Sequence, residues 1–374
     1  MTRCAIHKSL FLLAALLLVI TLTTGPAAAA DVPKLSLGYV FTTHHTPLMV
    51  AAIKGEAFKE DGVYLKTLIP KKKYMLMSAE NQPLAELTLL VSKSGSETIT
   101  LFAMNQMDLA LSSSTAFMSG VDKGTKIKAL CPMHVDGMAM VFPADSGVNG
   151  YEAVATAIKE SQTPFKIGYH SPTSAPRVVF EGALHKAGFK ITGDPNDATA
   201  DILMVDLKST SNLIPALLSK QVDCWVGPAP HPSVAEFKGV GHIALNSRDL
   251  PPEGDWHDFP CCVMGASESL IAERPEIVQA MTDLMTTSTR WSNSHRAEAA
   301  KISADWIGAP EEALAKSAII YSTDPTEKWL NGEQMFIDML RSMNKLKGNL
   351  KDTSPEETWA KLFDFTFVNN SLDR

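Results

Sequence analysis

Residues 35–63 read LSLGYVFTTHHTPLMVAAIKGEAFKEDGV, and this stretch decides the fold. Alternate apolar positions at 35–41 predict a β-strand. A polar turn at 42–46 follows, and a helix is expected at 47–59, because Pro47 lacks an N–H that the first helical turn does not need. A strand, a polar turn and a helix in this order are typical of α/β proteins with parallel sheets.

The same rhythm continues through the chain. Further strands are expected at 63–69, 107–111, 127–133, 138–142, 165–170, 202–207, 222–226, 242–246 and 262–265. Further helices are expected at 94–104, 175–187, 212–220, 275–296, 298–307, 310–319 and 332–344. Residues 71–92 fit least well and are interpreted as an extended excursion between a strand and a helix. A chain of 374 residues exceeds what one core usually supports, so two α/β units are expected.

The first thirty residues have the composition of a secretory signal peptide. Arg3 and Lys8 precede an apolar run at 10–22, and small residues at 28–30 offer a cleavage site. We therefore expect cleavage near Ala30 and export to the periplasm, with an uncleaved anchor as the alternative. The apolar run is short for a helix that spans a bilayer of about 30 Å.

Charge and cysteine content narrow the function. The net charge of −7 argues against partners such as nucleic acid and anionic membranes, which favour basic surfaces. The cysteines beyond the signal region, Cys131, Cys224, Cys261 and Cys262, form no CxxC or zinc-type spacing, so no metal and no cofactor are expected. The adjacent pair either forms a vicinal disulfide or consists of free, partly buried thiols.

Three polar turns, at 42–46, 112–115 and 171–174, follow expected strands and precede expected helices. Ligands of open parallel sheets bind at these strand ends, and helix N-termini favour polar or anionic groups. The candidate ligand contacts are Thr43, His44, His45, Ser113, Ser114, Thr115, Thr173, Ser174, Arg177, Trp225, Gly227 and His257. The alternatives are that Ser114 and Thr173 only cap helices, that Arg177 is structural and that Trp225 packs in the core.

Several segments together resemble a known family. They are MNQMDLALSSSTAFMSGVDKGTKIKAL (104–130), FKIGYHSPTSAPRVVFEGALHKAGF (165–189), LIPALLSKQVDCWVGPAP (213–230), FPCCVMGASESLIAERPEIVQAM (259–281) and WLNGEQMFIDML (329–340). With the opening stretch, and in this order, they resemble the periplasmic solute-binding proteins of ABC importers for nitrate, sulfonates, taurine and thiamine pyrimidines.

The resemblance implies a fold, a function and partners. The fold would be the two-lobed type II periplasmic-binding-protein fold, with two α/β lobes joined by two crossover segments. Lobe one would cover 31–138 plus 246–374, and lobe two 139–245. The protein would be a monomer that binds a small-molecule ligand without catalysis and delivers it to an ABC transporter permease. The favoured ligand is a sulfonate-like organic anion. A thiamine-type pyrimidine as the ligand, or a sensory role in place of transport, remains open as an alternative.

Other classes have less support in the sequence. A hydrolase is disfavoured because no G-x-S-x-G motif is present. A metal-binding protein is conceivable with ten histidines, but no H-x-x-x-H or H-E-x-x-H pairing occurs. Yeast thiamine-pyrimidine synthase is an enzyme of similar fold, and its CCCFC motif is absent here.

Overall fold

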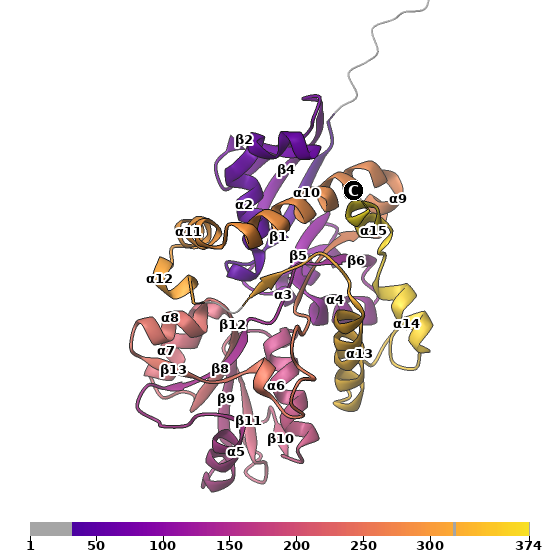
Figure 1. Ribbon diagram of the computed structural model, residues 1–374. Helices are drawn as coiled ribbons and strands as arrows, with labels where there is room; N and C mark the ends of the chain where they lie inside the picture. Colours follow the sequence, from indigo (N-terminus) through magenta and orange to yellow (C-terminus); the bar gives the residue numbers. More distant parts are fainter. Residues whose placement is uncertain (1–31, 317–318, 374) are drawn as a thin grey trace, which may run out of the picture. The chain divides into compact units, whose positions relative to one another are not determined.

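The computed structural model describes residues 32–316 and 319–373 (Figure 1). The expected signal peptide at 1–30 lies outside the described residues. From Lys34 onward the chain forms one compact unit. None of the helices in the described part is long and apolar enough to cross a membrane.

The first sheet has seven strands in the order β2-β3-β4-β1-β5-β14-β6. Their bounds are β1 (Lys34–Tyr39), β2 (Val63–Ile69), β3 (Lys73–Ser78), β4 (Pro83–Val91), β5 (Leu109–Ser113), β6 (Ile127–Pro132) and β14 (Cys262–Ser267). Strand β1 runs parallel to β4 and β5, whereas β14 is antiparallel to β5 and β6. The sheet is therefore mixed, although a parallel sheet was expected.

The excursion at 71–92 belongs to this sheet. Its two strands, β3 and β4, pair antiparallel with each other, and β4 pairs with β1 in the register Leu37 to Leu89. Residues along β4 alternate between more and less buried positions, as in a half-covered strand. The extended conformation was predicted correctly, but the place of both strands inside the main sheet was missed.

The second sheet has six strands in the order β10-β11-β9-β12-β8-β13. Their bounds are β8 (Met138–Pro143), β9 (Phe165–Tyr169), β10 (Ile191–Thr192), β11 (Ile202–Asp206), β12 (Cys224–Pro228) and β13 (Gly241–Asn246). Strands β10, β11, β9 and β12 are parallel, and β8 runs antiparallel to β12 and β13. A small third sheet pairs β7 (His134–Val135) with β15 (Ile320–Tyr321).

Helices flank both larger sheets (Figure 1). They are α2 (Thr46–Lys54), α3 (Gly95–Ala103), α4 (Ser114–Asp122), α5 (Tyr151–Glu160), α6 (Ala175–Lys186), α7 (Leu213–Leu218), α8 (His231–Phe237), α9 (Glu268–Glu273), α10 (Pro275–Ser294), α11 (Arg296–Ile307), α12 (Glu311–Leu314), α13 (Glu327–Ser342), α14 (Pro355–Leu362) and α15 (Thr366–Leu372).

Three helix predictions were wrong in extent, and one of them, expected at 332–344, begins five residues earlier at Glu327. The helix expected at 47–59 ends at Lys54, because Gly55 takes a positive φ of 48° and the chain continues as a 3-10 helix, Gly55–Asp61. The helix expected at 310–319 is reduced to α12, and strand β15 follows it. Helix α5 was not predicted at all, although apolar residues line one of its faces.

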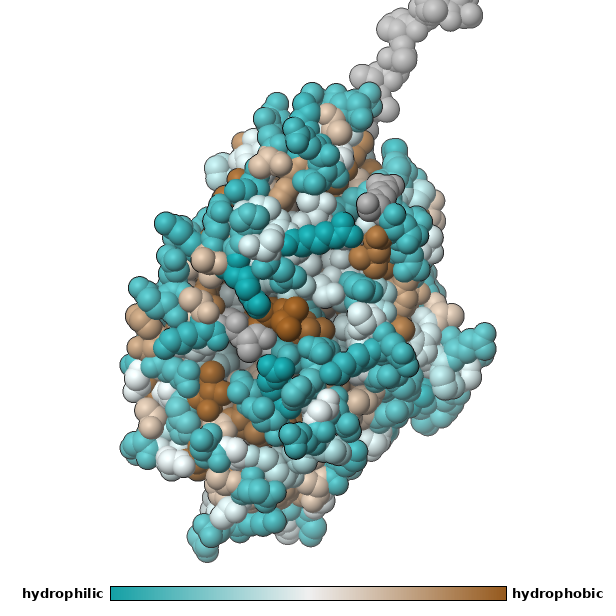
Figure 2. All heavy atoms as spheres, viewed as in Figure 1, coloured by the Kyte–Doolittle hydropathy of each residue, from teal (hydrophilic) through white to brown (hydrophobic). Residues whose placement is uncertain are grey.

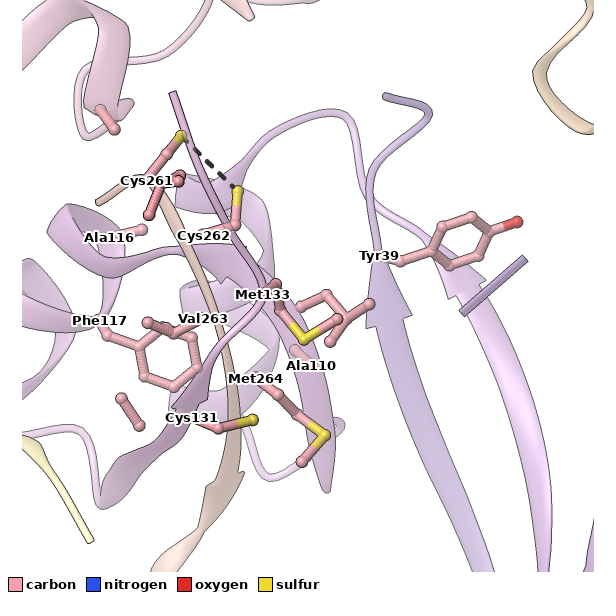
Figure 3. Packing of buried hydrophobic residues seen from close by; sticks show 14 of the residues in the cluster. Tyr39, Ala110, Ala116, Phe117, Cys131, Met133, Cys261, Cys262, Val263 and Met264 are labelled. Atoms are coloured by element: carbon pink, nitrogen blue, oxygen red, sulfur yellow. Dashed lines mark hydrogen bonds between the residues drawn. The ribbon is translucent and has the colours of Figure 1, made fainter. Parts of the chain in front are cut away.

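The core of the first sheet holds the starts of β14 and α4 in place. Figure 3 shows Phe117 of α4 beside Val263 of β14. Gly265 leaves the space that the Phe117 ring fills, since a Cβ at this position would collide with the ring. The backbone N–H of Ser114 donates to the carbonyl of Cys261 at 2.8 Å, which joins the helix to the strand where both begin.

Candidate functional site

Turns from the ends of both larger sheets meet around one small cavity. We call it the inner pocket; its volume is about 40 Å³. The polar residues that line it are Thr42, His44, His45, Ser112, Ser113, His170, Ser174, Thr210, Cys261 and Cys262. The three polar turns singled out in the sequence all contribute to it, as expected for strand ends that face each other.

A wider cavity adjoins the inner pocket. This outer pocket has a volume of about 700 Å³ and shares Val40 and Thr210 with the inner one. Apolar side chains from segments of both sheets line much of it, including Phe41, Leu218 and Ile307. On the face shown in Figure 2, hydrophobic residues form small patches within a mostly hydrophilic surface. Because its lining is largely apolar, the outer pocket offers an apolar approach to the inner pocket and its polar side chains.

The first turn fixes two histidines by backbone bonds. Thr42 caps the 3-10 turn at Thr43–His45, and its hydroxyl accepts from the His44 N–H at 2.8 Å. The Nδ1 atom of His45 accepts from the Val40 N–H at 3.0 Å. Both imidazoles are buried, so the turn presents them to the pocket and not to solvent.

Two cysteines and two histidines lie together at the inner pocket. His44 Nδ1 is 3.4 Å from the Cys261 sulfur and 3.6 Å from the Cys262 sulfur. The sulfur atoms are 3.9 Å apart and point to the same side (Figure 3), so the thiols are free and not joined in a disulfide. The rings of His44 and His134 have centroids 4.0 Å apart. We call this set the thiol–imidazole cluster; one donor atom from each of its members lies within 4.8 Å of the others.

The hydrogen bonds of both histidines leave a bare ring nitrogen toward the thiols. His44 Nε2 lies 3.0 Å from the Gly137 carbonyl, where an N–H donates, so Nδ1 carries the lone pair. His134 Nδ1 lies 3.4 Å from the Val135 carbonyl, and its Nε2 has no partner among the described residues. Such a set of two sulfurs and two imidazole nitrogens is able to hold a metal ion.

Burial keeps three imidazoles near the site, those of His134, His170 and His231, neutral. It lowers the pKa of His134 to about 4, that of His170 to about 3 and that of His231 to about 4. Burial likewise raises the pKa of the Cys261 thiol well above its usual value. At Cys262, burial is outweighed by hydrogen bonding within the cluster, chiefly with Cys261, which holds the pKa of its thiol well below its usual value.

The hydroxyl-bearing turns of the two sheets bond directly to each other. The hydroxyls of Ser113 and Thr115 donate to the Thr173 carbonyl at 3.2 and 2.7 Å. The Ser96 hydroxyl lies 2.9 Å from the hydroxyls of both Ser171 and Thr173. In this conformation the turns are therefore closed on each other beside the inner pocket.

The other residues selected from the sequence fall into different surroundings. Arg177 pairs with Glu181 at 2.8 Å and stacks on the Tyr169 ring, so its charge is already compensated. Trp225 is fully buried in a core cluster, and a Cβ at Gly227 would touch its ring. The other four lie as follows: Ser174 lines the inner pocket, Thr43 lines a separate cavity, Ser114 is buried at the start of α4, and His257 is partly buried in the loop before β14.

The ligand contacts selected from the sequence did not include the cysteine pair, His134, His170 or His231. These residues come from separate segments, so no spacing motif links them. The signal that was present was local: a Cys-Cys pair directly before an expected strand and a His-His pair directly after one. The expectation that the chain has no metal site rested on that missing spacing.

Helix α13 brings a carboxyl group into the core beneath α4. Glu333 is fully buried, and neither of its oxygens has a hydrogen-bond partner among the described residues. Burial raises the pKa of this carboxyl well above its usual value. The folded protein therefore holds a proton at Glu333 that the unfolded chain releases at lower pH, and stability is lost as pH rises above the unfolded pKa.

We expect Glu333→Gln to remove this pH-dependent loss. Relative to wild type, the variant should gain about 1.4 kcal/mol of unfolding free energy per pH unit between the unfolded and folded pKa values of the carboxyl. Urea denaturation at several pH values above 4 measures the gain, with exposed Glu253→Gln as the control. A difference that stays constant with pH would contradict a protonated Glu333.

Residues 28–308 match the model of the NMT1-like family. The chain belongs to this family. An uncharacterized protein of Methanocaldococcus jannaschii is 30% identical over 140 residues, which are 36% of this NMT1-like chain and 96% of that protein.

Solved structures establish the periplasmic-binding-protein fold. A zinc-bound ligand-binding component of an ABC-type import system from Staphylococcus aureus is similar, with a TM-score of 0.67, 15% identity and coverage of 91% of this chain and 99% of that one. The alkanesulfonate-binding protein SsuA from Xanthomonas axonopodis pv. citri, bound to MOPS, is similar with a TM-score of 0.62 and 15% identity. The match covers 85% of this chain and 96% of that one. The periplasmic nitrate-binding protein NrtA from Synechocystis is similar with a TM-score of 0.64 and 14% identity, and the match covers 92% of this chain and 89% of that one. The α/β fold expected from the sequence is thereby confirmed, as is the resemblance to ABC-import binding proteins.

Proposed function

We propose that this protein is the solute-binding component of an ABC importer, that it works in the periplasm, and that its solute binds in the inner pocket. The observation that carries the proposal is the meeting of turns from both larger sheets around a small cavity lined by serine, threonine, histidine and cysteine side chains. Membership of the NMT1-like family and the binding-protein fold support it. The solute would leave unchanged for a transporter permease, and the protein would act as a monomer.

The proposed mechanism is a hinge. Lobe one, 31–138 plus 246–374, and lobe two, 139–245, would separate to admit the solute and close over it. Opening has to break the bonds that Ser113 and Thr115 make to the Thr173 carbonyl. These bonds are neutral, and each contributes only about 0.5–1.5 kcal/mol, so a bound solute has enough energy to shift the population.

A sulfonate-like anion is the candidate solute that the sequence favoured. The alkanesulfonate-binding relative supports it. Within the described residues that line the inner pocket there is no lysine or arginine, and Arg177 is paired with Glu181. An anion would therefore depend on hydroxyl and backbone donors alone. A thiamine-type pyrimidine has less support, because Trp225, the expected stacking partner, is buried in the core.

Native mass spectrometry of protein purified without refolding tests this function. We expect one small bound species per chain that is lost on denaturation, and a smaller radius of gyration in scattering when that species is added back to stripped protein. Tight rebinding with an unchanged radius would contradict the hinge. Recovery of the species in a chemically altered form, with turnover, would contradict a purely binding role.

A further inference from the structure

We propose that the thiol–imidazole cluster binds one thiophilic transition-metal ion, Zn²⁺ or Cu⁺, and that this ion is the solute. The inference rests on the proposed function, and it names the class of solute for the same pocket. The cluster consists of His44, His134, Cys261 and Cys262.

The spacing of the donor atoms fits a tetrahedral ion. Bond lengths of about 2.3 Å to sulfur and 2.0–2.1 Å to imidazole nitrogen place the donors of a tetrahedron about 3.6 Å apart for nitrogen to sulfur and about 3.8 Å for sulfur to sulfur. The distances here are 3.4 and 3.6 Å from His44 Nδ1 to the two sulfurs, and 3.9 Å between the sulfurs. Three of the four donors therefore already have tetrahedral spacing, and the donor atom of His134 lies within 4.8 Å of them.

The second layer around the cluster orients its ligands. A metal-bound histidine typically donates its other ring N–H to a carbonyl, which fixes the tautomer. His44 does so to Gly137, and His134 faces the Val135 carbonyl in the same sense. The remaining nitrogen of His134 is buried without a hydrogen-bond partner among the described residues, a state that a bound ion would relieve.

The size of the inner pocket and the type of its donor atoms favour an ion over an organic solute. A water molecule needs a cavity volume of roughly 10–15 Å³, whereas the pockets of drug-sized ligands have volumes of about 300–1,000 Å³. The inner pocket, with about 40 Å³, has room for an ion and little more. Its soft sulfur and imidazole donors select Zn²⁺ or Cu⁺ over Mg²⁺ or Ca²⁺, which prefer oxygen ligands.

Access through the outer pocket favours a transported ion over a structural one. His44, Cys261 and Cys262 line the inner pocket, which shares residues with the wide outer pocket. The second sheet adds His170 at the inner pocket and His231 at the outer pocket, and each has a ring nitrogen without a partner among the described residues. When the turns close, His170 and His231 would thus be brought near an ion that is bound to the cluster.

The test begins with stripped protein in its reduced form. Chelator-competition titrations are done with Zn²⁺, and with Cu⁺ under anaerobic conditions. At least one of the two ions should bind with one equivalent per chain, and comparing the two titrations identifies which ion the site prefers. Co²⁺ should give the charge-transfer absorption of a thiolate complex. Bound Zn²⁺ should also protect Cys261 and Cys262 of the wild type from iodoacetamide, a readout that needs no substitution.

Variants locate the ion. Cys262→Ser should weaken metal binding by about 100-fold or more, exceeding the usual effect of losing an outer-shell partner. Cys224→Ser is the matched control, because it removes a buried thiol far from the cluster in sequence and should leave the affinity unchanged. Thermal melts establish that both variants fold. Equal affinity in both variants, or no stoichiometric binding, would overturn the metal site.

The role as solute has its own test. Zn²⁺ or Cu⁺ should reduce the radius of gyration, and His170→Ala should diminish that change. Metal binding with neither effect would overturn the assignment as solute and leave a structural site. If no metal binds but a copurified organic species compacts the protein, the metal inference fails while the proposed function stands.

Discussion

We expect Asp122→Ala to lower the free energy of unfolding by about 3–5 kcal/mol. Asp122 ends α4, and its buried carboxylate accepts backbone N–H groups of Lys347, Gly348 and Leu350, at 2.9 Å for the shortest bond to each. Alanine would leave these donors without an acceptor in a segment that connects α13 to α14. Chemical denaturation of the wild type and the variant measures the loss.

Asp122→Asn provides a graded control. Its single amide oxygen can keep the bonds from Gly348 and Leu350, which both reach Oδ1, and it loses the bond from Lys347 to Oδ2. The loss of stability should therefore be intermediate. If alanine and asparagine cost the same, or if alanine costs less than about 1 kcal/mol, the carboxylate does not hold this segment as argued.

The strands that could be predicted are those with a local pattern. The alternation at 35–41 and the apolar runs at 127–133 and 165–170 gave β1, β6 and β9 within two residues at either end. Strand direction could not be predicted in the same way. Strand β14 lies antiparallel between β5 and β6, and its partners are far from it in sequence.

Helix ends show how backbone geometry overrides composition. The apolar pattern at 47–59 is continuous, but the positive φ of Gly55 ends α2. Ser94 was predicted within a helix and instead caps α3, where its hydroxyl accepts from the Glu97 N–H. Both differences arise from single residues whose conformation depends on what surrounds them.

The candidate site was predicted where it depends on turns. His44, His45, Ser113 and Ser174 line the inner pocket, although their role as ligand contacts stays a prediction. Cys262 and His170 were missed because only the folded chain brings them beside the first turn. Arg177 shows the opposite case: its position next to a polar turn suggested an anion partner, and a carboxylate one helical turn away occupies it.

The hinge makes a prediction that does not depend on the solute. Ser96 at the start of α3 and Ser171 after β9 have hydroxyl oxygens 2.9 Å apart, so cysteines at both positions should form a disulfide on mild oxidation. This bond would tie the turns of the two sheets together. Cys261 and Cys262 are nearly inaccessible in the closed state, with 2% and 6% exposure, so iodoacetamide should reach them only when the turns separate.

In metal-free protein carrying Ser96→Cys and Ser171→Cys, we expect oxidation to slow the alkylation of Cys261 and Cys262 by about tenfold or more, because local opening is blocked while global unfolding remains the slower route. Peptide mass spectrometry measures the rate at each thiol. Cys131 and Cys224 are fully buried and serve as internal controls, since they react only through unfolding and should not show the same selective protection. Equal alkylation of the pocket thiols before and after oxidation would mean that these turns do not part and that a solute enters by another path.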